Sequence, residues 1–297
     1  MRVPLDARSL LLCVCLVIPM IGSAKPPSHW TGEVRAQTVI LSSGDVADVY
    51  APVIPRKFNQ RFQDAFPLVV VLQGALVDKS NYSRFGRRLA ANGYVVIIPN
   101  HEQFIPGFGD ALFTEVSVLT EALDQMIVED GDPSSNLFGI VDTNRLGVVG
   151  HSFGGSVAIN AAAGVCEPPF LCKDVDGDDQ VNEISFFDPG PLKAVVVYGS
   201  NRTDVDRDTS GVAVALLQGT VDGVAAPIKA DQTLPLLEQP HALIAIAGAN
   251  HYGICNENDP AADPNTPTLD QQAGLDQIVS WTDQWLRANL GGRSPDR

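Results

Sequence analysis

Short apolar runs recur along the chain and alternate with longer segments in which apolar residues have helical spacing. The runs span residues 68–72, 94–98, 146–149, 192–198, 212–217 and 242–247. Their length is typical of strands. Runs that are apolar at nearly every position indicate strands buried on both faces, as in a parallel sheet covered by helices.

Three segments have the apolar spacing of amphipathic helices. They span residues 82–92, 113–128 and 268–290, and a run of small residues over 156–163 predicts a fourth helix. On the predicted helix over 268–290, Trp281 and Trp285 are four residues apart, so both are expected to pack in the core. Residues 34–42 and 45–50 flank Ser43-Gly44 and predict an opening hairpin.

Strands that alternate with helices after an opening hairpin predict one α/β domain with a mainly parallel central sheet flanked by helices. The predicted domain spans residues 25–297. A loop is expected over residues 101–110, and a small insertion over residues 165–191 follows the small-residue helix.

The first 24 residues are expected to be a signal peptide. Arg2 and Arg8 precede an apolar run from Leu10 to Ile21, and small residues end the segment at Ala24. The run is short for a membrane span. The sequence therefore predicts a secreted or periplasmic protein with no membrane span after processing.

The remaining chain is strongly acidic. The full sequence holds 20 basic and 35 acidic residues, and loss of residues 1–24 leaves 18 and 34, a formal charge of −16. Such a charge repels phosphate backbones, and no basic patch offsets it. Nucleic-acid binding is excluded as a function.

Three cysteines remain after processing: Cys166, Cys172 and Cys255. In an oxidising compartment one disulfide can form among them, and three pairings are open. The local pairing of Cys166 with Cys172 is preferred, because the two are close in sequence.

The apolar run over residues 146–149 leads into Gly150-His151-Ser152-Phe153-Gly154 and then into a helix. This order of strand, G-x-S-x-G turn and helix is typical of a nucleophile elbow. Ser152 is therefore the candidate nucleophile. A plain glycine-rich turn is the alternative.

A serine nucleophile needs a base and a carboxylate that orients the base. Asp222 follows the run over 212–217, and His251 follows the run over 242–247. Since functional residues gather at the carboxyl ends of parallel strands, these two are the predicted triad partners of Ser152. His101, after the run over 94–98, is the main rival to His251.

The turn after the first buried strand is a candidate oxyanion hole. Main-chain N–H groups of Ala75 and Phe153 are the expected donors, and Gly74 allows the main chain to approach the substrate. Gln73, Gly74, His101 and Tyr252 are expected to line the substrate pocket.

Together these motifs resemble the α/β-hydrolase superfamily over residues 34–290, and within it the chlorophyllase and polyester hydrolase (bacterial cutinase) group. The matching segments are Leu72–Ala75, Tyr82–Ser83, Leu89–Pro99, Asp142–Leu146, Gly150–Gly155 and Gly248–Tyr252. The resemblance implies the α/β-hydrolase fold and a serine carboxylic-ester hydrolase that needs no cofactor for catalysis. Phe153 stands where chlorophyllase-like sequences usually carry a basic residue and polyester hydrolases a methionine.

An acidic loop lies within the insertion, over residues 174–185. Oxygen-bearing side chains at alternating positions suit Ca²⁺, although a glycine and a final bidentate acid are missing from the usual pattern. A structural calcium site and a solvated acidic loop both remain open. The candidate ligands are Asp174, Asp176, Asp178, Gln180 and Asn182, with Glu183 or Asp188 to complete the set.

The sequence thus predicts an exported serine hydrolase that cleaves small-molecule or polymeric carboxylic esters through an acyl-enzyme. One alternative is a non-catalytic binding protein on a hydrolase scaffold. Another is a peptidase or acyltransferase that uses the same triad.

Overall fold

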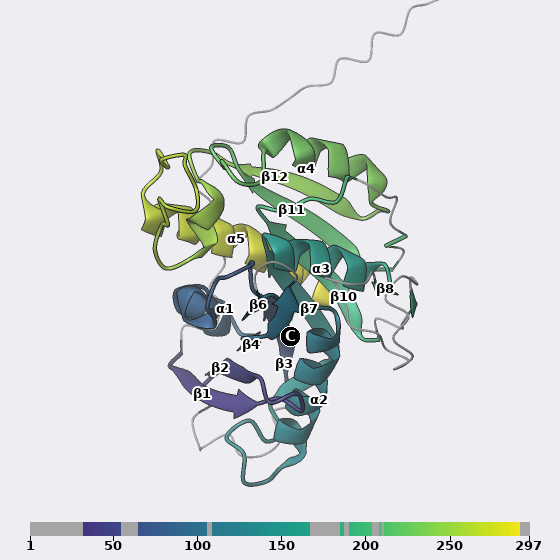
Figure 1. The fold of residues 1–297 in the computed structure, drawn as a ribbon. Coiled ribbons are helices and arrows are strands. Elements are labelled where there is room, and N and C mark those ends of the chain that lie inside the picture. The colour runs from purple at the N-terminus through teal and green to yellow at the C-terminus, as the bar shows by residue number, and fades with distance from the viewer. Residues whose placement is uncertain are drawn as a thin grey trace, which may run out of the picture.

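The computed structural model describes residues 32–54, 65–105, 109–166, 185–186, 190–203, 208–209 and 211–291. Its centre is an eight-stranded sheet in the order β1-β2-β4-β3-β7-β10-β11-β12 (Figure 1). The strands are β1 (Val34–Ile40), β2 (Val46–Pro52), β3 (Phe66–Leu72), β4 (Val95–Pro99), β7 (Val141–His151), β10 (Leu192–Tyr198), β11 (Ala213–Gly219) and β12 (His241–Ile246).

The six strands from β4 to β12 in this order pair in parallel, whereas β1 and β2 form an antiparallel hairpin at one edge. The predicted α/β fold with a mainly parallel sheet is therefore confirmed. Parallel strands bring their carboxyl ends to one edge of the sheet. The loops after β3, β7, β11 and β12 consequently gather at that edge.

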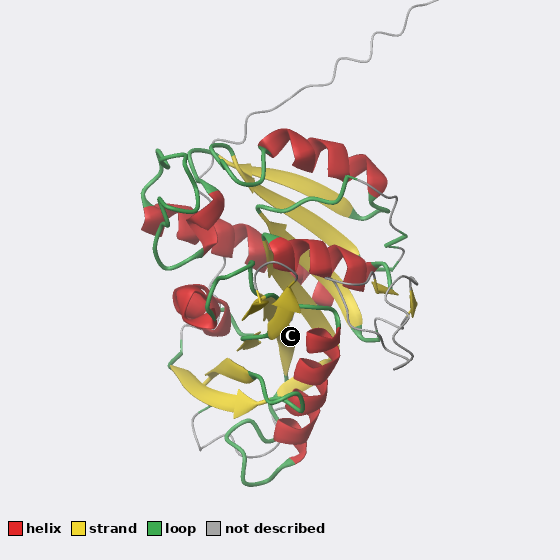
Figure 2. Ribbon diagram, viewed as in Figure 1, coloured by secondary structure: helices red, strands yellow, loops and turns green. Residues whose placement is uncertain are grey.

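Helices cover both faces of the sheet (Figure 2). Buried side chains of α1 (Ser83–Ala91) and α5 (Gln271–Leu290) pack on one face. Side chains of α2 (Ser117–Gly131), α3 (Phe153–Ala162) and α4 (Pro227–Thr233) pack on the other. The result is a three-layer arrangement.

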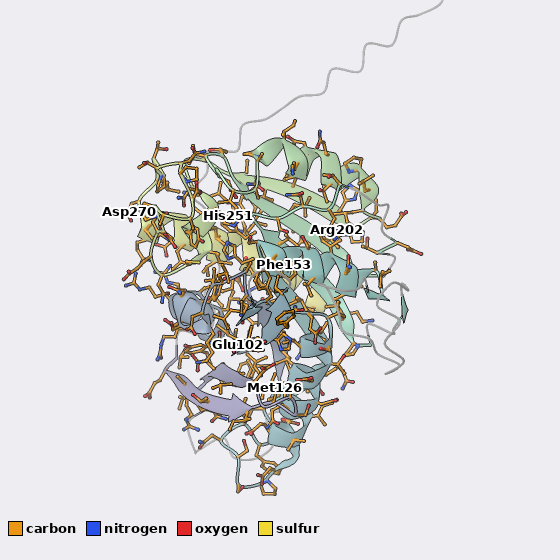
Figure 3. All side chains as sticks on the ribbon, viewed as in Figure 1. Glu102, Met126, Phe153, Arg202, His251 and Asp270 are labelled. Atoms are coloured by element: carbon orange, nitrogen blue, oxygen red, sulfur yellow. The ribbon has the colours of Figure 1, made fainter. Side chains whose placement is uncertain are left out.

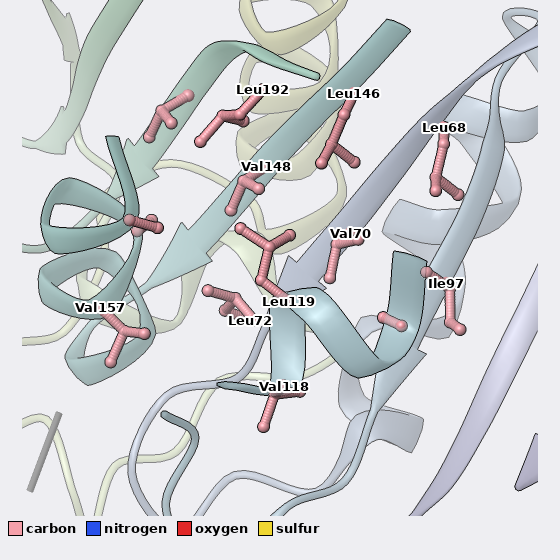
Figure 4. Close-up of a cluster of buried hydrophobic side chains, with 14 of the residues drawn as sticks. Leu68, Val70, Leu72, Ile97, Val118, Leu119, Leu146, Val148, Val157 and Leu192 are labelled. Carbon is pink, nitrogen blue, oxygen red and sulfur yellow. The ribbon is translucent and has the colours of Figure 1, made fainter. Parts of the chain in front are cut away.

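The central strands supply both layers of the core because successive side chains point to opposite faces. In β3, Leu68, Val70 and Leu72 join the layer under α2 and α3 (Figure 4). Val69 and Val71 join the layer under α1 and α5. Each fully buried side chain of this kind stabilises the fold by roughly 1.5–3 kcal/mol.

Shorter elements frame the loops. Among the residues that the structure describes, three are 3₁₀-helices: η2 (Lys79–Tyr82), η3 (Leu234–Leu236) and η4 (His251–Ile254). Within the described ranges, β5 (Glu102–Ile105) pairs antiparallel with β6 (Gly109–Leu112), and β8 (Val165–Cys166) pairs antiparallel with β9 (Ser185–Phe186).

Four expectations from the sequence need correction. The hairpin β5–β6 replaces the loop expected over 101–110, and β7 begins at Val141 rather than at 146. The helix after the elbow begins at Phe153 rather than at 156. Trp285 is half-buried, but Trp281 is 41% exposed and does not lie in the core.

Two predictions lie outside the described residues: the signal peptide over 1–24 and the candidate calcium ligands over 174–183 and at Asp188. The described part of the chain contains no cluster of three or more His, Cys, Asp or Glu side chains suited to a metal ion. Nor does any helix in those ranges have the length and apolarity needed to cross a membrane. Cys255 is a buried free thiol, so the two pairings that involve it are not formed.

Candidate active site

Ser152 lies in a strained turn between β7 and α3. Its backbone angles are φ 51° and ψ −120°, a conformation that residues with a side chain rarely adopt. The Ser152 N–H donates to the carbonyl of Tyr198 at 3.0 Å, which fixes the turn against the end of β10. This is the geometry of a nucleophile elbow.

Glycines make the elbow possible because other segments pass very close. A Cβ on Gly154 would lie 2.5 Å from the carbonyl oxygen of Gln73, and one on Gly155 would lie 2.5 Å from the Cβ of Ser200. Neither position can hold a side chain without movement of the backbone or of a buried neighbour. Glycine is required at both positions because the ends of β3 and β10 lie so close to the start of α3.

Asp222 and His251 form a hydrogen-bonded pair at the same edge of the sheet. The Nδ1 atom of His251 lies 2.9 Å from Oδ2 and 3.1 Å from Oδ1 of Asp222, and both side chains are buried. An ionised carboxylate only accepts hydrogen bonds, so Nδ1 carries the proton and donates. The Nε2 atom of a neutral His251 is then left as the basic nitrogen.

The Asp222 carboxylate is held by its own turn. Oδ1 accepts the main-chain N–H groups of Val224 at 2.9 Å and Ala225 at 2.7 Å, and Oδ2 accepts from the amide of Gln218 at 3.1 Å. The main-chain N–H of His251 donates to Asp263 at 2.8 Å. Both members of the pair are therefore fixed in place by neighbouring groups.

Gly199 connects this pair to the elbow. It follows Tyr198, the main-chain partner of Ser152, and a Cβ at this position would lie 3.0 Å from both Asp222 Oδ2 and His251 Nδ1. The His251 imidazole thus lies against the carboxyl end of β10, the strand that pairs with β7 beside Ser152. No hydrogen bond joins the Ser152 hydroxyl to His251 within the described residues, and such bonds are often long before substrate binds.

The turn after β3 lies beside the nucleophile. A Cβ on Gly74 would be 3.2 Å from the Cβ of Ser152, so the next residue, Ala75, is adjacent to the elbow. Leu76 follows with φ 62°, and its N–H donates to the carbonyl of Leu112 at 2.7 Å. Phe153 directly follows Ser152 at the start of α3 (Figure 3), so both predicted oxyanion donors belong to segments that adjoin the nucleophile.

Apolar side chains surround this turn. Leu76 is 58% exposed, and Leu112, Phe113 and Phe153 are half-buried. The rings of Phe113 and Phe153 meet edge to face, with 5.2 Å between centroids. We call these four residues the apolar rim. It gives the elbow a surface that suits apolar groups.

His101 and Gln73, assigned to a substrate pocket from the sequence, are both buried. The imidazole of His101 lies 2.6 Å from Asp45 and 3.4 Å from Glu115. Burial lowers the pKa of His101, but hydrogen bonds and charges from the two carboxylates outweigh burial and raise it to about 9. Gln73 exchanges two hydrogen bonds with the main chain of His101, at 3.2 and 3.3 Å.

His101 is therefore engaged in an ion cluster and is not in a position to replace His251 as the base. The ion cluster of His101, Asp45 and Glu115 holds the turn after β3 in place through the hydrogen bonds between Gln73 and the main chain of His101. Tyr252, also predicted to line a pocket, is half-buried with its ring edge-on to His251 at 5.6 Å. Burial and the charge of Asp259 raise the pKa of Tyr252 to about 12.

Sequence reasoning missed Gln218 and Asp263. Gln218 had a signal, since it is a polar residue at the carboxyl end of an otherwise apolar strand. Asp263 had none, because it lies in the irregular segment between η4 and α5. His151, the residue before Ser152, is fully buried.

The strand order and the elbow define an α/β-hydrolase. The family model described as PETase: PET hydrolase-like matches residues 33–167. Over the matched residues the chain is similar to PET hydrolase-like proteins, and its mostly parallel central sheet flanked by helices has the α/β-hydrolase fold. The similarity implies an ester hydrolase of the α/β-hydrolase type. The match includes Ala75 and Ser152 but ends before Asp222 and His251. Comparison with curated proteins found no match.

Proposed function

We propose that the protein is a serine carboxylic-ester hydrolase with Ser152 as nucleophile, His251 as base and Asp222 as the carboxylate that orients the base. The observation that carries this proposal is the buried Asp222–His251 pair, 2.9 Å apart, beside a serine held in a strained turn. An activated serine requires such a base and such an orienting carboxylate.

In the proposed reaction the Oγ atom of Ser152 forms a bond to the ester carbonyl carbon while its proton passes to Nε2 of His251. The N–H groups of Ala75 and Phe153 donate to the resulting oxyanion. When the tetrahedral intermediate collapses, the bond to the leaving oxygen breaks and His251 returns the proton to that oxygen. Water then attacks the acyl-enzyme by the same steps and releases the acid.

For the substrate we propose esters with apolar acyl groups, aromatic polyesters included. The apolar rim beside the oxyanion turn supports this class, and so does the similarity to a family described by hydrolysis of PET. We also propose export through residues 1–24, with a mature chain that begins at Lys25. N-terminal sequencing of protein recovered outside the cytoplasm of an expression host tests this part.

The catalytic proposal is tested with a fluorophosphonate probe and with p-nitrophenyl esters of graded acyl length. Ser152→Ala is expected to abolish labelling and to lower kcat by at least about 10⁴-fold. Ser156→Ala is the matched control, because that hydroxyl lies one turn further along α3 and contacts Ser200 and Asn201. Equal labelling of Ser152→Ala and wild type would refute the assignment.

Product analysis separates hydrolysis from the other reactions of such a triad. Wild-type protein is given an ester with water alone, then with added alcohol or amine, and finally a peptide of matching acyl group. Release of free acid in all ester reactions supports a hydrolase. Dominant transfer to the added acceptor, or faster cleavage of the peptide, would assign an acyltransferase or a peptidase instead.

A further inference from the structure

A second buried histidine, His151, lies between the oxyanion turn and the loop of His251. Its Nδ1 atom is 2.8 Å from the hydroxyl of Tyr82, and that hydroxyl accepts the N–H of Gly74 at 2.9 Å. Its Nε2 atom is 3.0 Å from the carbonyl oxygen of His251. His151 is thus hydrogen-bonded directly to Tyr82 and to the loop of His251, and through the Tyr82 hydroxyl it is linked to Gly74.

The contacts determine which nitrogen carries the proton. A carbonyl oxygen only accepts, so Nε2 of His151 must hold a proton and donate it to His251. Complete burial and the nearby His251 lower the pKa of His151 well below its ordinary value, which leaves the ring neutral. Its Nδ1 is then an acceptor, and Tyr82 must be the donor.

The result is a chain of hydrogen bonds with one direction. The Gly74 N–H donates to Tyr82, the Tyr82 hydroxyl donates to His151, and Nε2–H of His151 donates to the main chain of His251. Every buried donor and acceptor along it is satisfied. The partners are 8, 69 and 100 residues apart in sequence.

The residues around His151 pack closely against its imidazole. A Cβ on Gly74 would lie 2.8 Å from Nδ1 of His151, so the oxyanion turn rests directly on the imidazole. The rings of His151 and His251 are 4.9 Å apart. The other titratable rings that face His151 are Tyr82, Tyr198 and Tyr252.

We propose that His151, with its proton on Nε2, is a positioning residue that joins the oxyanion turn to the loop of the base through Tyr82 and the carbonyl of His251. This rests on the proposed function. Its neutral state matters for the chemistry: His251 becomes positively charged during each acyl transfer, and a second positive ring 4.9 Å away would oppose that charge.

The test uses Tyr82→Phe, His151→Leu, His151→Gln and the double variant Tyr82→Phe/His151→Leu. Rates are measured on a short p-nitrophenyl ester and divided by active sites counted with the fluorophosphonate. We expect Tyr82→Phe and His151→Leu each to lower kcat by about 10- to 100-fold with little change in KM, since a misplaced catalytic group costs rate. The double variant is expected to lose no more than the worse single variant, because either change breaks the same chain.

His151→Gln should recover part of the rate lost in His151→Leu, since its amide can donate to the carbonyl of His251. The matched control is Tyr94→Phe, which removes a buried hydroxyl bonded at 3.4 Å to the main chain of Asp283, away from the site. Tyr94→Phe is expected to keep the wild-type kcat, whatever its effect on the melting temperature.

The proton assignment has its own readout. In a ¹⁵N spectrum of histidine-labelled protein, one imidazole should keep the neutral Nε2–H pattern at pH values below the ordinary histidine pKa of about 6.5, and that signal should be missing from His151→Gln. A neutral Nδ1–H pattern, or protonation near pH 6.5, would overturn the proposal.

Failure of this inference can be told apart from failure of the proposed function. If Ser152 is labelled and wild-type turnover is normal, but Tyr82→Phe and His151→Leu keep the wild-type kcat, only the positioning role is refuted. If wild type shows neither labelling nor turnover, the proposed function itself fails. Should His151→Leu not fold, the rate of Tyr82→Phe and the ¹⁵N pattern decide the matter.

Discussion

The buried ion cluster around His101 predicts a loss of stability in mild alkali. His101 lies 2.6 Å from Asp45 and 3.4 Å from Glu115, and its pKa is about 9 in the folded chain. In the unfolded chain the pKa of a histidine is about 6.5. The folded protein therefore holds one more proton than the unfolded chain between these two values.

The sign and size of the effect follow from this difference. A pKa raised by folding gives a stabilisation that is complete below about pH 6.5 and is lost as the pH rises through about 9. The full shift, about 2.5 units at about 1.4 kcal/mol each, corresponds to about 3 kcal/mol. Between about pH 6.5 and about pH 8 the free energy of unfolding should fall by about 1.5 kcal/mol from this group alone.

The measurement is urea unfolding at these two pH values, in wild type and in His101→Asn. This window lies below the range in which cysteine and tyrosine side chains of the unfolded chain mainly titrate. His101→Asn cannot bind the extra proton, so its unfolding free energy should change by about 1.5 kcal/mol less than that of wild type. Equal pH dependence in the two proteins would show that His101 is not held in its charged form.

Two further predictions concern the triad and the elbow. Asp222→Asn should lower kcat by about 10³- to 10⁴-fold in steady-state assays, because the amide no longer selects the Nδ1–H form of His251; retention of most activity would contradict this role. Gly154→Ala should destabilise the fold by about 3 kcal/mol or more, because the new Cβ meets the carbonyl of Gln73. Gly131→Ala is its control in the same thermal melts, since nothing lies within 4 Å of a Cβ there; equal melting temperatures would contradict the elbow argument.

The alternation and spacing of apolar residues were enough to predict the central strands. The run over 68–72 is buried at every position, as β3 requires between two layers of helices. The hairpin β5–β6 was missed because its alternation is inverted: Gln103 is buried and Phe104 is 68% exposed. Gln103 tolerates burial because its amide donates to the carbonyls of Phe113 and Thr114, a contact that local pattern does not reveal.

The start of β7 was missed for a similar reason. The polar residues over 141–145 lack strand periodicity, yet Val141 and Asp142 pair with Phe66 and Pro67 of β3. Arg145 adds hydrogen bonds to the main chain of Ala65 at 2.6 Å and to Asp142. Pairing with a neighbouring strand, and not local composition, extends this element.

By itself the sequence determined the order of the central strands and of the helices that flank them, the elbow at Ser152 and the positions of Asp222 and His251 after later strands. These features depend on periodicity and on turn residues, which act over a few neighbours. Only the tertiary structure decided which side chains meet across the site: His101 with Asp45 and Glu115, and Tyr82 with His151. Those partners are between 14 and 69 residues apart, and hydrogen bonding across such separations depends on how the strands are ordered in the sheet.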